Sequence, residues 1–347
     1  MSMTLKIDGS HGEGGGQILR TALSLAAIRQ QPVEIHNIRS GRKKPGLRPQ
    51  HLMAVKAMAL ITAANVKGAE LGSMRLYFEP RQITPGSYSL DIGTAGSTSL
   101  VLQTMIPALL IAKKASRVDI IGGTHVPWSP CFHYLQGVFV PALQEMGGAL
   151  RLEMKRWGWY PKGGGKVIAF ISPVPEFCAV GRTWRGKLED TYVLSAVSNL
   201  PMSIAERQRD QVLKRFRDHG YKVPRIELLK GPSPGTGTVV FVRARFEKGT
   251  AGFTSLGKKG KPAEQVADDA CLDFFEFMAS GAVVDDHLAD QLVLYMALSK
   301  GHSSLTAGRI TKHLMTNMWV IEQFLPTKFE VDEETGRVSV EGVGFST

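Results

Sequence analysis

Cysteines, long apolar runs and acidic residues are all scarce in this sequence. The three cysteines, Cys131, Cys178 and Cys271, form no CxxC pair, and their odd number gives no disulfide framework, which favours a reducing compartment. No stretch reaches the roughly 18 to 20 apolar residues of a membrane span. The first eight residues hold no apolar run of signal-peptide length. We therefore expect a protein without a membrane partner, in the cytoplasm or, if the source is eukaryotic, the nucleoplasm.

The shortage of acidic residues leaves the chain strongly basic. Its 42 Lys and Arg residues against 31 Asp and Glu residues give a formal net charge of +11. This excess favours a polyanionic partner, most simply nucleic acid or a nucleotide, although plain solubility is the alternative. The 347 residues are 43% hydrophobic, which excludes global disorder and predicts about two domains.

One pattern of strands, glycine loops and helices recurs along the chain. A strand at residues 4–7 passes through a glycine loop into a helix, and related sets return after residue 88 and after residue 281. This repetition, with a period of about 80 residues, indicates duplicated units. We predict an α/β (α+β) fold in which residues 1–184 and 280–347 form a large domain of repeated βαβαββ units, each a sheet backed by two helices.

Residues 185–279 interrupt that pattern. They contain a highly charged amphipathic helix at 203–219 and a second helix at 263–279, with strands before and between them. Residues 249–261 are rich in Gly and Lys and are interpreted as a flexible basic loop. We therefore predict an inserted smaller domain with the order β-α-β-β-α.

The first candidate site is the glycine run Gly12–Gly16. Glycines allow close backbone approach, and the helix N-terminus that follows offers free amides and the positive end of a dipole to a phosphate. Glu13 is unusual in such a loop unless it faces a metal ion that itself faces phosphate. Gln17 and Arg20, on the first turn of the helix, could reach the same anion. A merely tight turn is the alternative.

Two further segments combine charge with other signals. The loop from Arg39 to Arg48 carries five basic residues and is made rigid by Pro45 and Gly46, which favours phosphate recognition over a solvated run. Trp157 and Trp159 lie among basic residues, so they suit base stacking and core packing equally well.

Three histidine-containing groups are less informative. His125, Cys131 and His133 have no zinc-site spacing, so we expect no metal there. A carboxylate-rich segment, residues 285–290, suits either acid–base and nucleotide contacts or an ordinary helix N-terminus. His313, at the start of an apolar helix, is by itself most easily explained as a core residue.

Taken together, the motifs of this chain resemble those of the RNA 3′-terminal phosphate cyclases. The motifs that carry this resemblance run in order along nearly the whole chain and match only weakly in the inserted segment. They are Asp8-Gly9 with Gly12–Arg20, Ile38–Arg42 with Lys44–Leu47, Gln50–Leu52, Gly93–Ser97 with Leu102–Thr104, Gly122–Thr124, Gly158–Gly165, Leu288–Leu292, and His313-Leu314 with Thr316-Asn317.

The resemblance implies a reaction. Such an enzyme uses ATP and a divalent metal, Mg²⁺ or Mn²⁺, to convert an RNA 3′-phosphate end to a 2′,3′-cyclic phosphate. A histidine, which maps to His313, attacks the α-phosphorus and releases pyrophosphate. AMP then passes to the RNA 3′-phosphate and is displaced by the neighbouring 2′-hydroxyl. A neutral imidazole is a competent nucleophile near neutral pH.

The resemblance also implies roles for further residues. Glu13 holds the metal. Gln17, Arg20, Arg39 and Arg42 bind the phosphates of ATP or of the RNA end. The nucleotide pocket is lined by Gln103, Pro130, His287, Asp290 and Gln291. His287 stands where relatives can carry a tyrosine that stacks on adenine.

The main rival is the cyclase-like branch of the family, whose members assist ribosome assembly without the nucleophile. The presence of His313 argues against that branch. Enolpyruvyl transferases, which also consist of βαβαββ units, are a second rival, but they do not explain a histidine in this motif. The expected partners are ATP and an RNA with a 3′-phosphate end, and the protein is expected to be a monomer or a homodimer.

Overall fold

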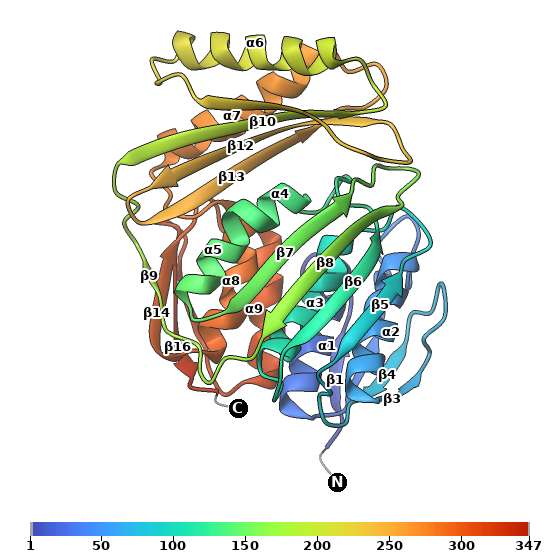
Figure 1. Cartoon of the computed structure of the whole chain (residues 1–347). Coiled ribbons are helices and arrows are strands. Elements are labelled where there is room, and N and C mark those ends of the chain that lie inside the picture. The colour runs from blue at the N-terminus through green and yellow to red at the C-terminus, as the bar shows by residue number, and fades with distance from the viewer. Residues whose placement is uncertain (1–2, 346–347) are drawn as a thin grey trace.

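The computed structural model describes residues 3–345 and contains four sheets of four strands each. Three of these sheets, with their helices, form the larger lower part in Figure 1, and the fourth stands above them. No helix in this described part of the chain is long and apolar enough to cross a membrane.

The first unit has the order βαβαββ. Its strands pair in the order β1-β2-β4-β3, with β1 parallel to β2 and the other pairs antiparallel. Its elements are β1 (Leu5–Asp8), α1 (Gly16–Arg29), β2 (Val33–His36), α2 (Pro49–Thr62), β3 (Asn65–Lys67) and β4 (Leu76–Glu79).

The second unit repeats this order, with strands paired as β5-β6-β8-β7. The helical connection after β6 is interrupted by a π-helical turn, η1. The elements are β5 (Ser87–Asp91), α3 (Thr98–Leu110), β6 (Ser116–Gly122), α4 (Phe132–Tyr134), η1 (Leu135–Phe139), α5 (Val140–Glu145), β7 (Ala149–Arg156) and β8 (Gly165–Ser172).

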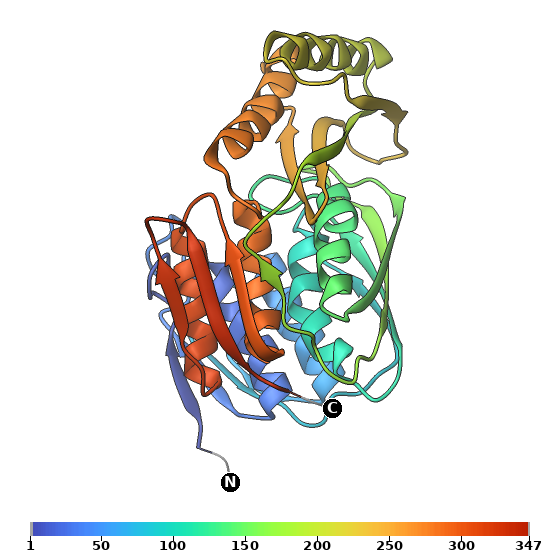
Figure 2. The ribbon, with the colours of Figure 1, turned by 90° about the vertical axis from the view of Figure 1, so that its left-hand side faces the viewer.

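The third unit is split by the insertion. Its first strand precedes the insertion and its first helix follows it, yet its strands still pair in the order β9-β14-β16-β15 (Figure 2). The elements are β9 (Gly181–Arg182), α8 (Asp286–Leu298), β14 (Lys300–Thr306), α9 (Lys312–Phe324), β15 (Phe329–Asp332) and β16 (Arg337–Val343). The predicted α/β fold of repeated βαβαββ units is confirmed.

The inserted segment has its own sheet, in the order β11-β10-β12-β13, and its own cluster of buried apolar residues around Phe216, Val242 and Phe274. Its elements are β10 (Leu188–Ser198), α6 (Met202–Asp218), β11 (Arg225–Lys230), β12 (Gly237–Phe246), β13 (Gly249–Leu256) and α7 (Ala263–Ser280). The domain boundaries at residues 184 and 280 stay a prediction.

The prediction of a flexible loop at residues 249–261 was wrong for most of its length, because β13 makes the order of the insert β-α-β-β-β-α. This strand pairs with β12 from Gly249 to Leu256. Gly252 of this strand serves packing rather than flexibility, since a Cβ there would lie 2.7 Å from Val138 and 3.0 Å from Phe241 and Tyr134.

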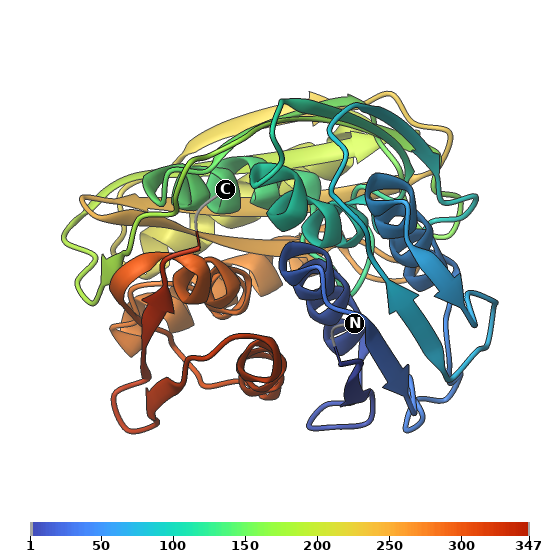
Figure 3. The same ribbon diagram turned by 90° about the horizontal axis from the view of Figure 1, so that it is seen from below.

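The helices of the three units pack against one another inside the three sheets, as Figure 3 shows from below. The central helix α1 contacts α2, α3 and α9, and α9 also contacts α8. Eleven of the fourteen residues of α1 are buried, including the small residues Ala22 and Ala26. Small side chains allow helices to approach closely. At their N-terminal ends, the loop before α1 contacts the first turns of α9, where the Glu13 N–H donates to Thr316.

Trp157 and Trp159 form the junction with the inserted sheet. Both are buried, and a Cβ on Gly231 or Gly237 of the insert would lie 2.2 or 2.1 Å from their rings. Of the two alternatives left open by the sequence, core packing therefore holds. His125 stacks on Trp157 with ring centroids 4.3 Å apart, and its Nε2 lies 2.9 Å from Nδ1 of His133.

The His125–His133 pair is neutral near neutral pH. Burial lowers the pKa of His133 to about 4, and burial together with His133 lowers the pKa of His125 well below its usual value. Residues 3–345 contain no group of three or more His, Cys, Asp or Glu side chains that could hold a metal ion.

The pH dependence of stability tests this neutral pair. An unfolded histidine has a pKa of about 6.5, whereas His133 in the folded protein has a pKa of about 4. Between these two values, protons bind the unfolded chain but not the folded one. The free energy of unfolding therefore falls as the pH is lowered from about 6.5 to about 4. His133→Asn keeps a polar group for His125 but cannot titrate. We expect it to remove about 2 kcal/mol of the loss between pH 7 and pH 5 in urea unfolding. An identical pH dependence in variant and wild type would contradict the assignment.

Candidate active site

A cleft of about 560 Å³ lies between the central helices and the inserted sheet. Its walls come from α1, α3, α8 and α9, from the loop between β6 and α4, and from β13 and α7 of the insert. The predicted site residues that line it are Gln17, Arg20, Gln103, Pro130, His287, Asp290, Gln291 and His313. The fold therefore brings together residues from both ends of the chain.

His313 lies on the first turn of α9 and faces Glu13 of the glycine loop. The helix begins with Thr311, whose side-chain oxygen accepts a hydrogen bond from the Leu314 N–H. The His313 side chain is 54% exposed, and its Nδ1 is 2.5 Å from Oε2 of Glu13. This exposure overturns the simplest interpretation of an isolated histidine in an apolar helix, namely a buried core residue.

Glu13 is held in place by two further residues. Its backbone N–H donates to Oγ1 of Thr316 at 3.1 Å, one turn after His313 on α9. Arg42 forms an ion pair with its other carboxylate oxygen, Oε1, and also donates to its carbonyl oxygen at 3.3 Å. The three predicted residues Glu13, Arg42 and His313 thus form one contiguous group, although Glu13 and Arg42 do not line the cleft itself.

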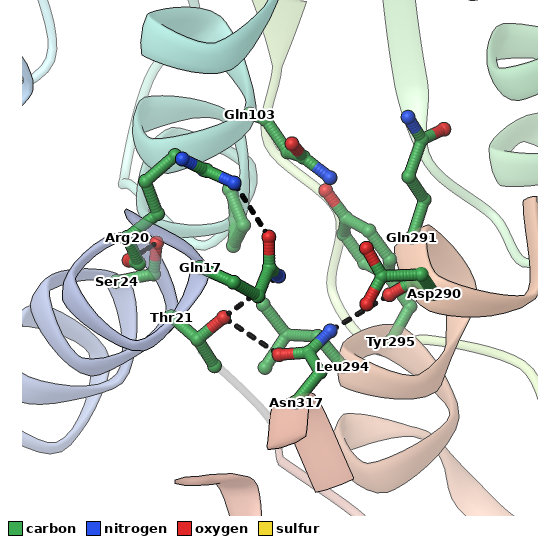
Figure 4. Close-up of a pocket in the computed structure, with 11 residues that line it drawn as sticks. Gln17, Arg20, Thr21, Ser24, Gln103, Asp290, Gln291, Leu294, Tyr295 and Asn317 are labelled. Carbon is green, nitrogen blue, oxygen red and sulfur yellow. Dashed lines mark hydrogen bonds between the residues drawn. The ribbon is translucent and has the colours of Figure 1, made fainter. Parts of the chain in front are cut away.

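A smaller cavity of about 20 Å³ lies under the cleft, between α1, α3, α8 and α9 (Figure 4). Arg20 donates to Oε1 of Gln17 at 2.6 Å. Asn317 accepts from the Thr21 hydroxyl at 2.6 Å and donates to the Asp290 carbonyl at 2.7 Å. These bonds connect α1, α8 and α9 through polar groups where an apolar contact would be expected.

The charges at this cavity are strongly shifted by burial. Burial lowers the pKa of Arg20 to about 10, opposed by the charges of Asp290 and Glu13, so the guanidinium stays positive at neutral pH. Burial raises the pKa of Asp290, and its electrostatic interactions with His313 and Arg20 oppose that rise.

Several polar atoms around this cavity are free to bind a ligand. Arg20 Nε, Asp290 Oδ1, Gln291 Oε1 and the Tyr295 hydroxyl are buried and have no hydrogen-bond partner among the residues that the structure describes. Because unpaired buried polar groups are costly, such atoms are usually satisfied by water or by a ligand. The bottom of the cleft, where it adjoins the small cavity, therefore offers unpaired polar groups that a polar ligand could bind.

Arg39 is placed differently from the other predicted residues. It does not line the cleft, and its Nη1 donates to the carbonyl oxygens of Lys44 and Gly46, both at 2.8 Å. These bonds brace the basic loop, which agrees with the rigidity expected from its Pro-Gly pair. Phosphate binding by Arg39 stays a prediction.

His51 supports the glycine loop from behind. Its Nδ1 accepts a hydrogen bond from the Arg48 N–H, and burial together with neighbouring arginines lowers its pKa to about 3. A Cβ on Gly16 would lie 2.4 Å from His51 Nε2. Packing against His51 therefore requires a glycine at position 16, independently of any anion that the loop binds.

His287 is exposed on the first turn of α8, edge-on to the Tyr134 ring at 6.0 Å. The helix begins with Asp285, which accepts from the backbone N–H groups of His287 and Leu288, from the Tyr134 hydroxyl at 2.6 Å and from the Gly252 N–H at 3.2 Å. Of the two alternatives for the carboxylates of this segment, Asp285 is therefore a helix cap, and it also ties β13 of the insert to the cleft.

Sequence reasoning missed the aromatic residues that line the cleft, among them Trp128 and Phe253. Neither belongs to a repeated motif, and Phe253 lies in the strand that was expected to be a loop. Lys261, expected to lie in a flexible loop, is instead fixed by two contacts. Its Nζ lies 2.6 Å from a carboxylate oxygen of Asp269 and donates a hydrogen bond to the Ser255 hydroxyl.

Glu13 suits a metal ion that is shared with a ligand. A Mg²⁺ or Mn²⁺ ion can be held by one carboxylate together with phosphate oxygens and water, without a cage of protein ligands. If that ion bound Oε1 of Glu13, Arg42 would lose its ion pair with this oxygen. Its guanidinium could then bind a phosphate instead.

Comparison with known proteins identifies the family. A family described as RNA 3′-terminal phosphate cyclase matches residues 11–331. The chain belongs to the RNA 3′-terminal phosphate cyclase family. A relative named RNA 3′-terminal phosphate cyclase in Pyrobaculum aerophilum is 45% identical over 349 residues, which cover 99% of this chain and 100% of the relative. The family relative in Koribacter versatilis is 45% identical over 328 residues, 94% of this chain and 92% of its own.

Replacing Gly12 tests how closely the glycine loop approaches α9. Gly12 has a φ of +55°, and a Cβ there would lie 2.4 Å from Thr316 Oγ1. Gly220 has a φ of +72° with no atom near its Cβ position. Both alanine variants carry left-handed strain of about 1–2 kcal/mol, but only Gly12→Ala must displace Thr316. We expect Gly12→Ala to lower the free energy of unfolding by about 1 kcal/mol more than Gly220→Ala; equal losses would show that the approach is not tight.

Proposed function

We propose that this protein is an ATP-dependent RNA 3′-terminal phosphate cyclase, which converts an RNA 3′-phosphate end to a 2′,3′-cyclic phosphate and releases AMP and pyrophosphate. Membership of the family supports this function. The observation that carries it is the position of His313, which is exposed in a cleft with its Nδ1 2.5 Å from Oε2 of Glu13. The cyclase-like ribosome-assembly branch lacks this nucleophile and is therefore the weaker alternative.

His313 is the nucleophile in this proposal. Because Nδ1 faces Glu13, the other ring nitrogen, Nε2, is the one free to attack the α-phosphorus of ATP. A P–N bond forms and the bond to the pyrophosphate oxygen breaks. Glu13 stabilises the positive charge that develops on the imidazole, in the way a carboxylate supports the histidine of a hydrolase triad.

Two further transfers complete the reaction. An oxygen of the RNA 3′-phosphate attacks the phosphorus on His313, so the P–N bond breaks and His313 becomes neutral again. The RNA 2′-hydroxyl then attacks its own 3′-phosphorus, closes the ring and releases AMP. Each step forms one bond to phosphorus and breaks another, which replaces one difficult step by easier ones.

The charged residues around His313 bind the phosphates. Arg20, which stays protonated although it is buried, and Gln17 lie at the cleft floor, and Arg42 lies beside Glu13. Donors fixed before the reaction stabilise the charge that develops on phosphate oxygens. Glu13 is the residue that would hold the divalent ion, which when bound neutralises charge on the phosphates.

The nucleotide pocket consists of the remaining predicted residues. Gln103, Asp290 and Gln291 offer polar groups at the cleft floor, while Pro130 and the exposed ring of His287 offer apolar surface for the adenine. An imidazole can stack on a base, although less extensively than a phenol ring.

Covalent labelling tests the nucleophile. Incubation with α-labelled ATP and Mg²⁺ or Mn²⁺ should yield a labelled protein whose bond is acid-labile and alkali-stable, as expected of a phosphorus–nitrogen bond. His313→Ala should lose the adduct completely, because no other residue is proposed to attack.

His302 provides a matched control for this experiment. It is also 54% exposed and lies near a carboxylate, with its Nδ1 3.7 Å from Glu341, but it does not line the cleft. His302→Ala should form the adduct at the wild-type rate. An adduct of normal yield in His313→Ala, with unchanged circular dichroism, would overturn the assignment.

A further inference from the structure

One large aromatic side chain in the cleft is left uncovered by the fold. Trp128, in the loop between β6 and α4, lines the same cleft as His313 and is 94% exposed. Tryptophan is highly buried in most proteins, since its ring has the largest apolar surface of any side chain. An uncovered tryptophan at the rim of a binding cleft therefore indicates a surface that a ligand covers.

The backbone of Trp128 is strained in a way that packing does not explain. Its φ of +61° is in the left-handed region, which costs a residue with a Cβ about 1–2 kcal/mol. The exposed indole buries too little surface to offset this cost. The loop itself maintains the conformation, with Pro127 and Pro130 on either side and a hydrogen bond from Ser129 Oγ to the Val126 carbonyl at 3.2 Å. Strain that the surrounding loop enforces is characteristic of functional positions.

The cleft has a polar floor and an aromatic rim, and these suit different parts of the substrates. Arg20, Gln103 and Gln291 line both the cleft and the small cavity below it, so they form the floor. A volume of about 560 Å³ is that of a small-molecule site. It can enclose a nucleotide, but an RNA chain that delivers its end to His313 must continue outward past the rim.

We propose that Trp128 is a stacking platform for a base at the 3′ end of the RNA. This inference rests on the proposed function and specifies how its polymeric substrate is held. An indole can stack on any base, so the platform binds RNA ends with little sequence preference. It acts on RNA binding and not on the attack of His313 on ATP, for which no RNA is needed.

Two separate measurements test the platform. The first is the affinity for a fluorescein-labelled RNA oligonucleotide with a 3′-phosphate, measured by fluorescence anisotropy without ATP. The second is the rate of adduct formation with α-labelled ATP and no RNA. Trp128→Ala should bind the RNA about tenfold more weakly and form the adduct at the wild-type rate, while Trp128→Phe should recover most of the RNA affinity.

Trp184 provides the matched control, because it is 62% exposed but does not line the cleft. Trp184→Ala should leave both measurements unchanged. A slower adduct step in Trp128→Ala with unchanged RNA affinity would overturn the proposal and assign the ring to the nucleotide. RNA affinity that is unchanged, or weakened equally in both alanine variants, would also overturn it. If the wild type binds RNA through Trp128 but never forms a cyclic end, the proposed function fails while the platform stands.

Discussion

The contact between Glu13 and His313 is the constraint on which the rest of the site depends. It joins a loop of the first unit to a helix of the third, and it requires the backbone of the glycine loop to lie against α9. The Thr316 hydroxyl oxygen accepts a hydrogen bond from the Glu13 N–H at 3.1 Å. This oxygen lies so close to the loop that there is no room for a side chain at Gly12. The same approach brings α1 and α9 together at their N-terminal ends, where the free backbone amides favour an anion. Repeated units with short helices can supply this geometry because their helices meet inside the three sheets (Figure 3).

A second constraint is the polar floor of the cleft inside an otherwise apolar helical core. Arg20 and Asp290 are oppositely charged, and burial shifts the pKa of each toward its neutral form while each opposes the shift of the other. Replacing a buried charged pair by apolar side chains often costs no stability. A buried guanidinium and carboxylate beside a cavity, with polar atoms left unpaired, are instead typical of a functional site.

Much of the fold was predictable from the sequence, because a glycine loop between a strand and an apolar helix marks the start of each of the first two units. The resemblance of the motifs to the cyclase family, confirmed by the match over residues 11–331, placed eight predicted residues around one cleft. Two features were not predictable. Strand β13 was hidden because its glycines have the composition of a loop, although one of them, Gly252, makes room for Tyr134 and Phe241. The environments of Trp128 and Trp157 could not be distinguished, since burial depends on contacts between segments distant in the sequence.

The cyclisation of RNA ends tests the central claim most directly. Two oligonucleotides of the same sequence, one with a 3′-phosphate and one with a 3′-hydroxyl, are incubated with the protein, ATP and Mg²⁺ or Mn²⁺, and the end groups are identified by mass spectrometry. We expect only the first to lose the mass of one water molecule, because ring closure needs the 3′-phosphate that AMP activates. A protein that binds both oligonucleotides and leaves the 3′-phosphate end unchanged in the presence of ATP would contradict the account.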